Sequence, residues 1–259
     1  MRNLHKYYYK DYFSESSEQI VVNRQQRNVV LNWINSDSDD NKSIIKVRNA
    51  ELCKPIPNYR NPIEKNPLVN TDFSLTIQYP GLVTGIGIDH EAKIEGEFKL
   101  GVHFDWTHGM PVVYGSSVKG VLRAWFKEFY KPNKTQPSVD DAFDSIFEGK
   151  ENGKPKSIYD RDIFFDAVIT QADSKGRILC SDSITPHGGE NHDNPLKNPT
   201  PLTFMKIAPG CTMEFRFKLV PSVINGKEFS ASQKKALFEE ILKTVGIGAK
   251  TNVGYGQFR

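Results

Sequence analysis

Apolar and polar residues alternate along several stretches of the chain, which is the pattern of a half-buried β-strand. We expect strands at residues 73–79, 94–106, 163–170 and 211–220, and the second of these shows the longest alternation. A short apolar end at Phe258 indicates a brief final strand.

Apolar residues recur at helical spacing in further stretches that also carry helix start or stop signals. The clearest apolar stripe consists of Val118, Val121, Leu122, Trp125, Phe126 and Phe129, and Ser117 is the expected N-cap of this helix. A short helix is expected from Ser138 onward. A longer helix begins with a capping box formed by Ser230 and Gln233 and ends at Gly246.

The first 70 residues differ from the rest of the chain. Residues 17–35 have a loose helical pattern, residues 36–42 are polar, and four prolines lie within residues 54–67. Proline lacks an amide hydrogen and opposes regular structure. We therefore expect an N-terminal helical extension and linker at residues 1–70, with 36–70 as a connector, and one domain at residues 71–259.

The expected elements over residues 94–258 follow the order strand, helix, strand, strand, helix and short strand. This is the order of the ferredoxin-like (RRM-like) α+β fold, in which two helices cover one face of a four-stranded antiparallel sheet. The N-terminal extension and long insertions would surround this core, and the other face of the sheet would be free for a ligand or partner. RNA-recognition modules and many unrelated enzymes share this topology, so the order alone assigns no function.

The 259 residues include 34 Lys and Arg against 31 Asp and Glu, a formal charge of +3. This total does not indicate a nucleic-acid partner by itself, because phosphate binding depends on local clusters of Lys and Arg. No stretch is long and apolar enough for a membrane helix, and the start lacks a signal-peptide pattern, so we expect a cytoplasmic protein. Cys53, Cys180 and Cys211 fit neither a disulfide framework nor a zinc knuckle and are expected to be reduced.

The most specific feature is the glycine-rich run at residues 245–256. Four glycines within eleven residues permit positive φ and close approach of the backbone, and they expose amide hydrogens that can cradle phosphate oxygens, with Lys250 supplying charge. The run is not a Walker A motif, because GxxxxGK[ST] is absent. The alternative interpretation is a helix C-cap followed by a tight hairpin.

A second candidate segment spans residues 115–123, which read GSSVKGVLR. Lys119, Arg123 and Lys127 recur every four residues on the side of the helix away from the apolar stripe. Ser116 and Ser117 at the helix start, with free amides and a nearby lysine, favour an anion site. The alternative is an ordinary solvated basic face.

Histidines and carboxylates give weaker signals. His187, His192 and Asp193 lie in a loop rich in Gly, Asn and Pro, where nothing fixes metal-ligand spacing, so we expect no metal site and a loop that faces RNA or another subunit. His90, His103 and His108 are candidates for general acid or base chemistry. The carboxylates of Asp160, Asp162 and Asp166 specify no acid and base pair, and we expect them at the surface.

The segments 115–123 and 245–256 together resemble hallmarks of the RAMP superfamily of CRISPR RNA-binding proteins. Residues 182–187 (DSITPH) and 84–87 (TGIG) are similar to the DxxTPH and TGxG segments of the sixth Cmr subunit family in type III-B effector complexes. The resemblance covers residues 80–258. It departs from that family after His187, where this chain has GGENHD in place of the tyrosines often found there.

The resemblance implies a non-catalytic subunit that holds the 3′ part of a guide crRNA and contacts neighbouring Cmr-type RAMP subunits in antiviral targeting of RNA. Its partners would be the crRNA, the target RNA and those subunits, with no membrane, no cofactor and no small-molecule substrate. The residues that would contact RNA are Ser116, Ser117, Lys119, Arg123, His187, Gly246, Gly248, Lys250, Thr251, Gly254 and Tyr255. Tyr255 would either stack on a base or pack in the core.

Two other functions remain open from the sequence. The first is a metal-independent RAMP endoribonuclease that processes CRISPR repeat RNA with a histidine as general acid or base. The second is an interaction protein that contacts only neighbouring subunits. Salt-sensitive binding of RNA would argue against the second, because neutralised phosphates release counterions.

Overall fold

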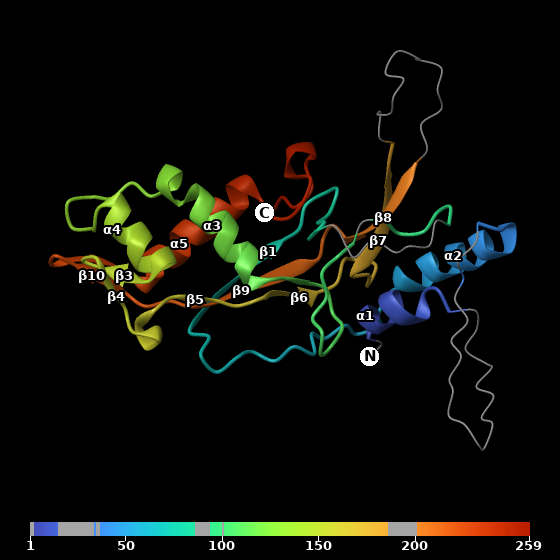
Figure 1. Cartoon of the computed structure of the whole chain (residues 1–259), viewed down its shortest axis with the longest axis horizontal. Helices are drawn as coiled ribbons and strands as arrows, with labels where there is room; N and C mark the ends of the chain where they lie inside the picture. The colour runs from blue at the N-terminus through green and yellow to red at the C-terminus, as the bar shows by residue number, and fades with distance from the viewer. Residues whose placement is uncertain (1–2, 15–33, 35–36, 86–93, 100, 186–200) are drawn as a thin grey trace, which may run out of the picture.

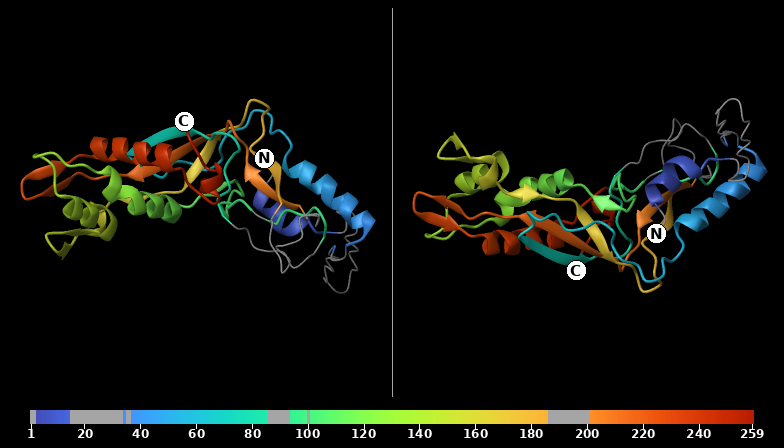
Figure 2. Two further views of the ribbon diagram at one scale, coloured as in Figure 1. Left: turned by 90° about the horizontal axis from the view of Figure 1, so that it is seen from above. Right: turned by 90° about the horizontal axis from the view of Figure 1, so that it is seen from below.

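The computed structural model describes residues 3–14, 34, 37–85, 94–99, 101–185 and 201–259. The molecule is elongated: a sheet covered by helices forms one half, and a hairpin with a long helix beside it forms the other (Figure 1). Figure 2 shows the same division from above and from below. The prediction of a mixed α+β protein is confirmed.

The main sheet is antiparallel. Its strands follow the order β1 (Thr71–Thr76), β9 (Thr212–Lys218), β6 (Ala167–Gln171) and β2 (Val112–Val113), and β5 (Ile163–Phe164) also pairs with β9. Beyond β1, Ile77 forms an isolated bridge with Phe258. Strands are therefore present in three of the four expected segments, one of them in two pieces, and at Phe258 the pairing is a single bridge.

Helices α3 (Gly115–Phe129) and α5 (Ala231–Val245) cover one face of this sheet (Figure 1). The side chains of Met213, Phe215 and Phe217 in β9 are fully buried, and the ring of Phe217 lies 5.7 Å from that of Phe238 in α5. Burial of side chains of this size contributes roughly 1.5–3 kcal/mol each. The alternation in β9 therefore holds the helical layer against the sheet.

Local sequence signals fix two helix starts as predicted. The Ser230 side chain accepts a hydrogen bond from the amide of Gln233, whose side chain accepts one from the amide of Ser230, so the capping box is present. The Ser138 side chain accepts a hydrogen bond from the amide of Asp141 at the start of α4 (Val139–Phe143), which continues as the π-helix η2 (Asp144–Glu148).

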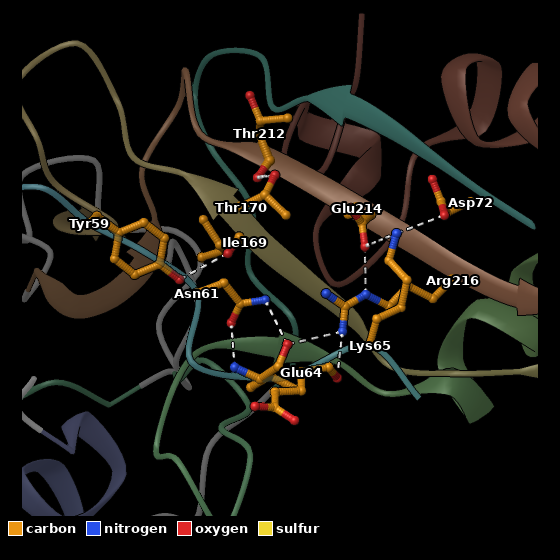
Figure 3. A network of polar contacts seen from close by, with 11 residues as sticks. Tyr59, Asn61, Glu64, Lys65, Asp72, Ile169, Thr170, Thr212, Glu214 and Arg216 are labelled. Atoms are coloured by element: carbon orange, nitrogen blue, oxygen red, sulfur yellow. Dashed lines mark hydrogen bonds and ion pairs between the residues drawn. The ribbon is translucent and has the colours of Figure 1, made fainter. Parts of the chain in front are cut away.

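Residues 59–70, here called the strap, cross the opposite face of the sheet (Figure 3). The hydroxyl of Tyr59 donates a 2.9 Å hydrogen bond to a main-chain carbonyl of β6. Arg216 in β9 donates from Nη1 to the carbonyl oxygens of Ile63 and Glu64, both at 3.2 Å, and is only 7% exposed. The expectation that this face is free for a ligand is therefore wrong where the strap lies.

Ion pairs attach the strap to two strands. Nζ of Lys65 lies 2.8 Å from the carboxylate of Asp72 in β1 and 3.6 Å from that of Glu214 in β9. Glu214 also accepts a 2.6 Å hydrogen bond from Nε of Arg216 (Figure 3). The four charges balance one another, so the strap is part of the folded sheet.

The expected strand at residues 94–106 is absent from the described part of that segment. Its apolar residues Phe98, Val102 and Phe104 are buried, but at Phe98 side chains take the main-chain bonds: Tyr8 donates to the carbonyl of Phe98, and the Phe98 amide donates to the hydroxyl of Tyr12. The alternation therefore matches burial, and pairing is limited to isolated bridges of Gly101 with Gly85 and of Phe104 with Pro111 and to single main-chain bonds such as that from the amide of Lys99 to the carbonyl of Thr203. The tyrosines belong to the short helices α1 (Leu4–Lys6) and η1 (Tyr7–Asp11) and the turn after them.

The expected connector at residues 36–70 contains a helix, α2 (Asp39–Leu52). The side chain of Ser38 accepts a hydrogen bond from the amide of Asn41, so the polar run interpreted as a break is a helix cap. Ile45 and Leu52 are the buried residues of α2, which explains its weak apolar periodicity. The helix expected at 17–35 lies outside the described residues, apart from residue 34, which has no helical assignment.

Two-stranded hairpins accompany the main sheet. One consists of β7 (Leu179–Ile184) and β8 (Leu202–Ile207) and stands in the half of the molecule that holds α2 (Figure 1). The hairpins β3 (Lys150–Glu151) with β4 (Lys154–Pro155) and β10 (Ser222–Ile224) with β11 (Lys227–Phe229) lie at the opposite end, near the 3₁₀ turn η3 (Ile158–Asp160).

Asp162, expected at the surface, is buried beside these hairpins. Its side chain and that of Lys234 in α5 are both fully buried, with Nζ of Lys234 2.7 Å from Oδ2 of Asp162. Lys234 also donates to the carbonyl of Val220 at 2.6 Å, and Asp162 accepts from the amide of the same residue at 2.9 Å. A buried ion pair persists when such further bonds satisfy it.

Candidate nucleic-acid interface

The glycine-rich run begins by ending helix α5. Gly246 has φ 72°, and its amide donates a 3.0 Å hydrogen bond to the carbonyl of Leu242. A Cβ at this position would lie 2.5 Å from the carbonyl oxygen of Gly256, so glycine is required. Gly246 is buried and its amide is already bonded, so its amide is not free to bind phosphate.

The inner side of the run is fixed to the segment that follows β1. The amide of Ala249 donates to the carbonyl of Val83, and the amide of Gly256 donates to that of Gly81, both at 2.8 Å. Gly248 has φ 98°, and a Cβ there would lie 2.3 Å from the carbonyl oxygen of Val83. The run therefore contains the tight hairpin of the alternative interpretation.

Residues 248–254, here called the loop tip, face outward. They include the 3₁₀ turn η4 (Thr251–Val253), and Gly248, Asn252 and Val253 are exposed. The amides of Val253 and Gly254 are bonded within the tip, to the carbonyls of Lys250 and Thr251. Within the described residues, the amides of Gly248, Lys250, Thr251 and Asn252 have no hydrogen-bond partner.

Lys250 lies in the left-handed region with φ 61°, among these free amides. Within the part of the chain that the structure describes, its ammonium group has no carboxylate partner. Consecutive free N–H groups beside a cation form the kind of concave backbone site that binds anions. Half of the predicted phosphate site is thus available: the tip offers amides and a charge, whereas Gly246 and Gly254 offer no free amide.

Tyr255 packs in the core, which is the second of the two expectations for this residue. It is 7% exposed, its ring lies 5.9 Å from that of Phe204, and its hydroxyl donates a 2.7 Å hydrogen bond to Asp182. Burial, followed by the bond to Asp182, raises the pKa of Tyr255 well above its usual value. In this position the ring is not available for stacking on a base.

Asp182 and Lys206 both contact Tyr255. Lys206 was not among the site residues predicted from the sequence. The two side chains form an ion pair across the β7–β8 hairpin, and Nζ of Lys206 lies 5.4 Å from the centre of the Tyr255 ring. Burial raises the pKa of Asp182, but the hydrogen bonds from Lys206 and Tyr255 outweigh it, and the net pKa is lowered. The run LTFMKI at residues 202–207 was the available signal for a strand that carries Lys206.

The start of α3 differs from the prediction in its cap. The N-cap residue is Tyr114, not Ser117, and the amide of Ser117 donates to the carbonyl of Tyr114 at 2.8 Å. The carboxylate of Asp166 takes the role of the cap by accepting a 2.7 Å hydrogen bond from the amide of Gly115. Ser116 is exposed beside this cap. The negative charge of Asp166 already neutralises part of the anion site expected at this helix start.

The basic face of α3 is largely paired. Arg123 pairs with Glu148, and Lys127 lies 2.7 Å from Asp140. Exposed pairs of this kind stabilise a protein by about 0–1 kcal/mol and exchange partners easily. Lys119 has no carboxylate partner among the described residues, and its ammonium group lies 5.9 Å from the centre of the Phe164 ring.

The two candidate segments lie at the same end of the helical layer. Helices α3 and α5 run in opposite directions over the sheet, so the start of α3 and the loop after α5 both lie toward the middle of the molecule, on the side of the β7–β8 hairpin (Figure 1).

Thr84 of the TGxG-like segment and two of the candidate histidines contact neighbouring residues in the described part of the chain. The Thr84 hydroxyl accepts a 2.6 Å hydrogen bond from the amide of His103, and the His103 ring stacks 4.8 Å from that of Tyr114. Burial lowers the pKa of His103 below its usual value. His108 lies 3.0 Å from Asp105.

Other predicted groups fall outside the described residues: His90, His187, His192 and Asp193. Among the residues that are described, no group of three His, Cys, Asp or Glu side chains has the arrangement of a metal site. The three cysteines are unpaired, and burial raises the pKa of both Cys53 and Cys211 to about 12. In the same described part, no helix is long and apolar enough to cross a membrane.

Comparison with known proteins identifies the family. The RAMP superfamily matches residues 74–259. Subunit Cmr6 of the CRISPR system CMR from Saccharolobus solfataricus is 23% identical over 235 residues, which cover 86% of this chain and 73% of that protein.

Solved structures were also found, and one of them shows a similar fold. A chain in the cryo-EM structure of the type III-B Cmr-beta bound to cognate target RNA matches with a TM-score of 0.51 and 22% identity. The match covers 73% of this chain, which spans 57% of the length of that one. The crystal structure of Cmr6 from Pyrococcus furiosus matches with a TM-score of 0.36 and 17% identity, over 73% of this chain and 96% of that one. With a family match that covers most of the main sheet, both of its helices and the glycine-rich run, the chain belongs to the RAMP superfamily, and within it resembles Cmr6.

Proposed function

We propose that this chain is a non-catalytic, RNA-binding subunit of a type III-B CRISPR effector complex, where it holds the 3′ part of the guide RNA and contacts neighbouring RAMP subunits. The observation that carries the proposal is the loop tip, where the amides of Gly248, Lys250, Thr251 and Asn252 have no partner and the Lys250 ammonium group has no carboxylate partner in the described structure. The similarity to Cmr6, and to a chain in a Cmr complex bound to target RNA, supports the same conclusion.

The core that presents the loop tip is a ferredoxin-like unit in this proposal. Its first strand is β1, not residues 94–106, followed in order by α3, β6, β9, α5 and the bridge at Phe258. The spatial order Phe258, β1, β9, β6 is the one that two split βαβ units generate. Strand β2 and the strap are additions to this unit.

The loop tip would bind the backbone of RNA and not its sequence. Amide hydrogens and an ammonium group recognise phosphate oxygens, which every nucleotide carries. The strap covers part of the sheet face on which RRM modules stack bases, so base recognition by that mode has less room here. Binding would follow the end of the helical layer, from Lys119 to Lys250.

A titration of the full chain with fluorescent single-stranded RNA tests the proposal. The logarithm of the affinity should fall linearly with the logarithm of the KCl concentration, with a slope of about −0.7 for each phosphate contacted. Affinities for RNAs of different sequence but equal length should agree closely. Absence of RNA binding, or binding insensitive to salt, would leave the chain as a protein that contacts only other subunits.

The absence of catalysis is also part of the proposal, and repeat RNA tests it. The full chain should leave CRISPR repeat RNA intact in EDTA. A discrete product that disappears in a His103→Ala or His187→Ala variant would replace the proposal with the metal-independent endoribonuclease, since a single histidine would then act as the general acid or base.

A further inference from the structure

One strongly exposed aromatic ring lies next to the loop tip. Tyr79 is 85% exposed, the largest exposed fraction among the large hydrophobic side chains that the structure describes. Such a ring contributes little to the core, so the packing of this chain alone gives no reason for its position.

The segment that carries Tyr79 is held on both sides. Toward the end of the chain, the amide of Gln78 donates to the carbonyl of Gln257 at 2.9 Å, beside the bond from Gly256 to Gly81. Toward β8, Leu82 and Ile207 exchange two main-chain hydrogen bonds of 3.1 and 2.8 Å. Main-chain bonds on both sides fix the position of the backbone that carries the ring before any ligand binds.

A cleft with a volume of about 370 Å³ opens beside the Tyr79 ring. Its lining consists of Ile77, Gln78, Tyr79, Pro209, Gly210 and Arg259. The lining thus includes an aromatic residue, an arginine and a glutamine; the side-chain nitrogen of Gln78 donates a 2.7 Å hydrogen bond to the carbonyl of Phe258, which leaves its side-chain oxygen as an acceptor. The volume of the cleft lies in the range of sites for small organic groups, and the set of side chains matches a flat heterocycle with polar edges.

The cleft is adjacent to the loop tip. A Cβ built on Gly254 would lie 3.6 Å from Cδ of Pro80, so the tip lies close to the residue that follows Tyr79. Successive bases of a single strand are splayed from a continuous phosphate backbone. A strand whose phosphate is bound at the loop tip therefore presents a base to the Tyr79 ring.

We propose that Tyr79 and the adjoining cleft bind one unpaired nucleobase of the RNA whose backbone the loop tip holds. The base stacks on the Tyr79 ring, and Arg259 and Gln78 face its polar edge. This inference rests on the proposed RNA binding and adds to it a base-contacting residue, in place of the buried Tyr255.

The test uses the full chain and single-stranded RNA with 2-aminopurine placed at one position at a time. Stacking on Tyr79 should quench the fluorescence at one position in the wild-type protein, and the Tyr79→Ala variant should lose this quenching. Tyr79→Ala should also weaken binding by about tenfold, with an unchanged salt slope, because no phosphate contact is lost. Tyr79→Phe should keep both properties, since stacking needs no hydroxyl group.

Tyr159→Ala is the matched control, because Tyr159 is 77% exposed and lies in η3 at the other end of the molecule. It should bind RNA like the wild type. If the wild type binds RNA and Tyr79→Ala matches it in affinity and quenching, the base site is wrong while the proposed function stands. If the wild type binds no RNA, the proposed function fails, and the base site fails with it.

Discussion

The hydroxyl of Tyr255 donates a 2.7 Å hydrogen bond to Oδ2 of Asp182, and so joins two residues 73 positions apart. Lys206 pairs with the same carboxylate. Tyr255 belongs to the glycine-rich run, and Asp182 lies in β7. The loop tip and the β7–β8 hairpin are therefore parts of one folded unit, so a substitution in the hairpin should change the structure of the loop tip.

Stability at low pH should depend on Asp182. Burial acts to raise its pKa, but the bonds from Lys206 and Tyr255 lower it overall, so the folded value lies below the unfolded value of about 3.9. The group therefore stabilises the fold above pH 3.9 or so, and this contribution is lost as pH falls through the lower folded pKa. Urea unfolding between pH 6 and pH 2.5 should show a smaller loss for Asp182→Asn than for the wild type; equal losses would show that Asp182 is not involved.

Gly248→Ala should destabilise the protein by about 1–3 kcal/mol, because φ is 98° and the new Cβ would meet the carbonyl oxygen of Val83 at 2.3 Å. Gly153→Ala is the control: its φ is 73°, but nothing lies within 4 Å of a Cβ there. Thermal or urea unfolding should show the larger loss at Gly248. Equal losses of unfolding free energy in the two variants would show that positive φ alone causes the effect.

Arg216→Ala should release the strap. The substitution removes the donor to the carbonyls of Ile63 and Glu64 and leaves the carboxylate of Glu214 with Lys65 alone. Hydrogen bonds from charged groups contribute about 1.5–3 kcal/mol in such positions. Hydrogen exchange should rise in residues 59–70 more than in α5, and uniform exchange across both would contradict a local role.

Lys234→Met should cost about 3–5 kcal/mol, because it leaves the carboxylate of Asp162 buried without its cation. The double variant Lys234→Met, Asp162→Asn removes the unpaired charge and keeps an acceptor for the amide of Val220. It should recover most of the lost free energy of unfolding. A double variant as unstable as the single one would show that the buried charge is not the cause.

The sequence predicted features that depend on neighbouring residues. The capping box of Ser230 and the cap at Ser138 are formed within three positions, and both are present. The alternation of β9 also predicted its buried face correctly, because that face packs on the helical layer of α3 and α5, which the sequence predicted as well.

Features that depend on residues far apart in the sequence leave no local pattern from which they could be predicted. Arg216 bonds a carbonyl 153 positions away, and Lys234 meets Asp162 across 72 positions, so neither the strap nor the buried pair has a local signal. Residues 94–106 show the limit of periodicity: their alternation matches burial, but the hydroxyls of Tyr8 and Tyr12 take the backbone bonds of Phe98.

The central claim, that Lys250 and the loop-tip amides bind a phosphate of RNA, is tested most directly by the salt dependence of RNA affinity in Lys250→Ala. Lys227→Ala is the control, because Lys227 is exposed in β11 at the opposite end of the molecule. We predict that Lys250→Ala weakens binding equally for all RNA sequences and reduces the magnitude of the salt slope by about 0.7–1, whereas Lys227→Ala changes neither. A slope for Lys250→Ala equal to that of the wild type and the control would contradict the claim.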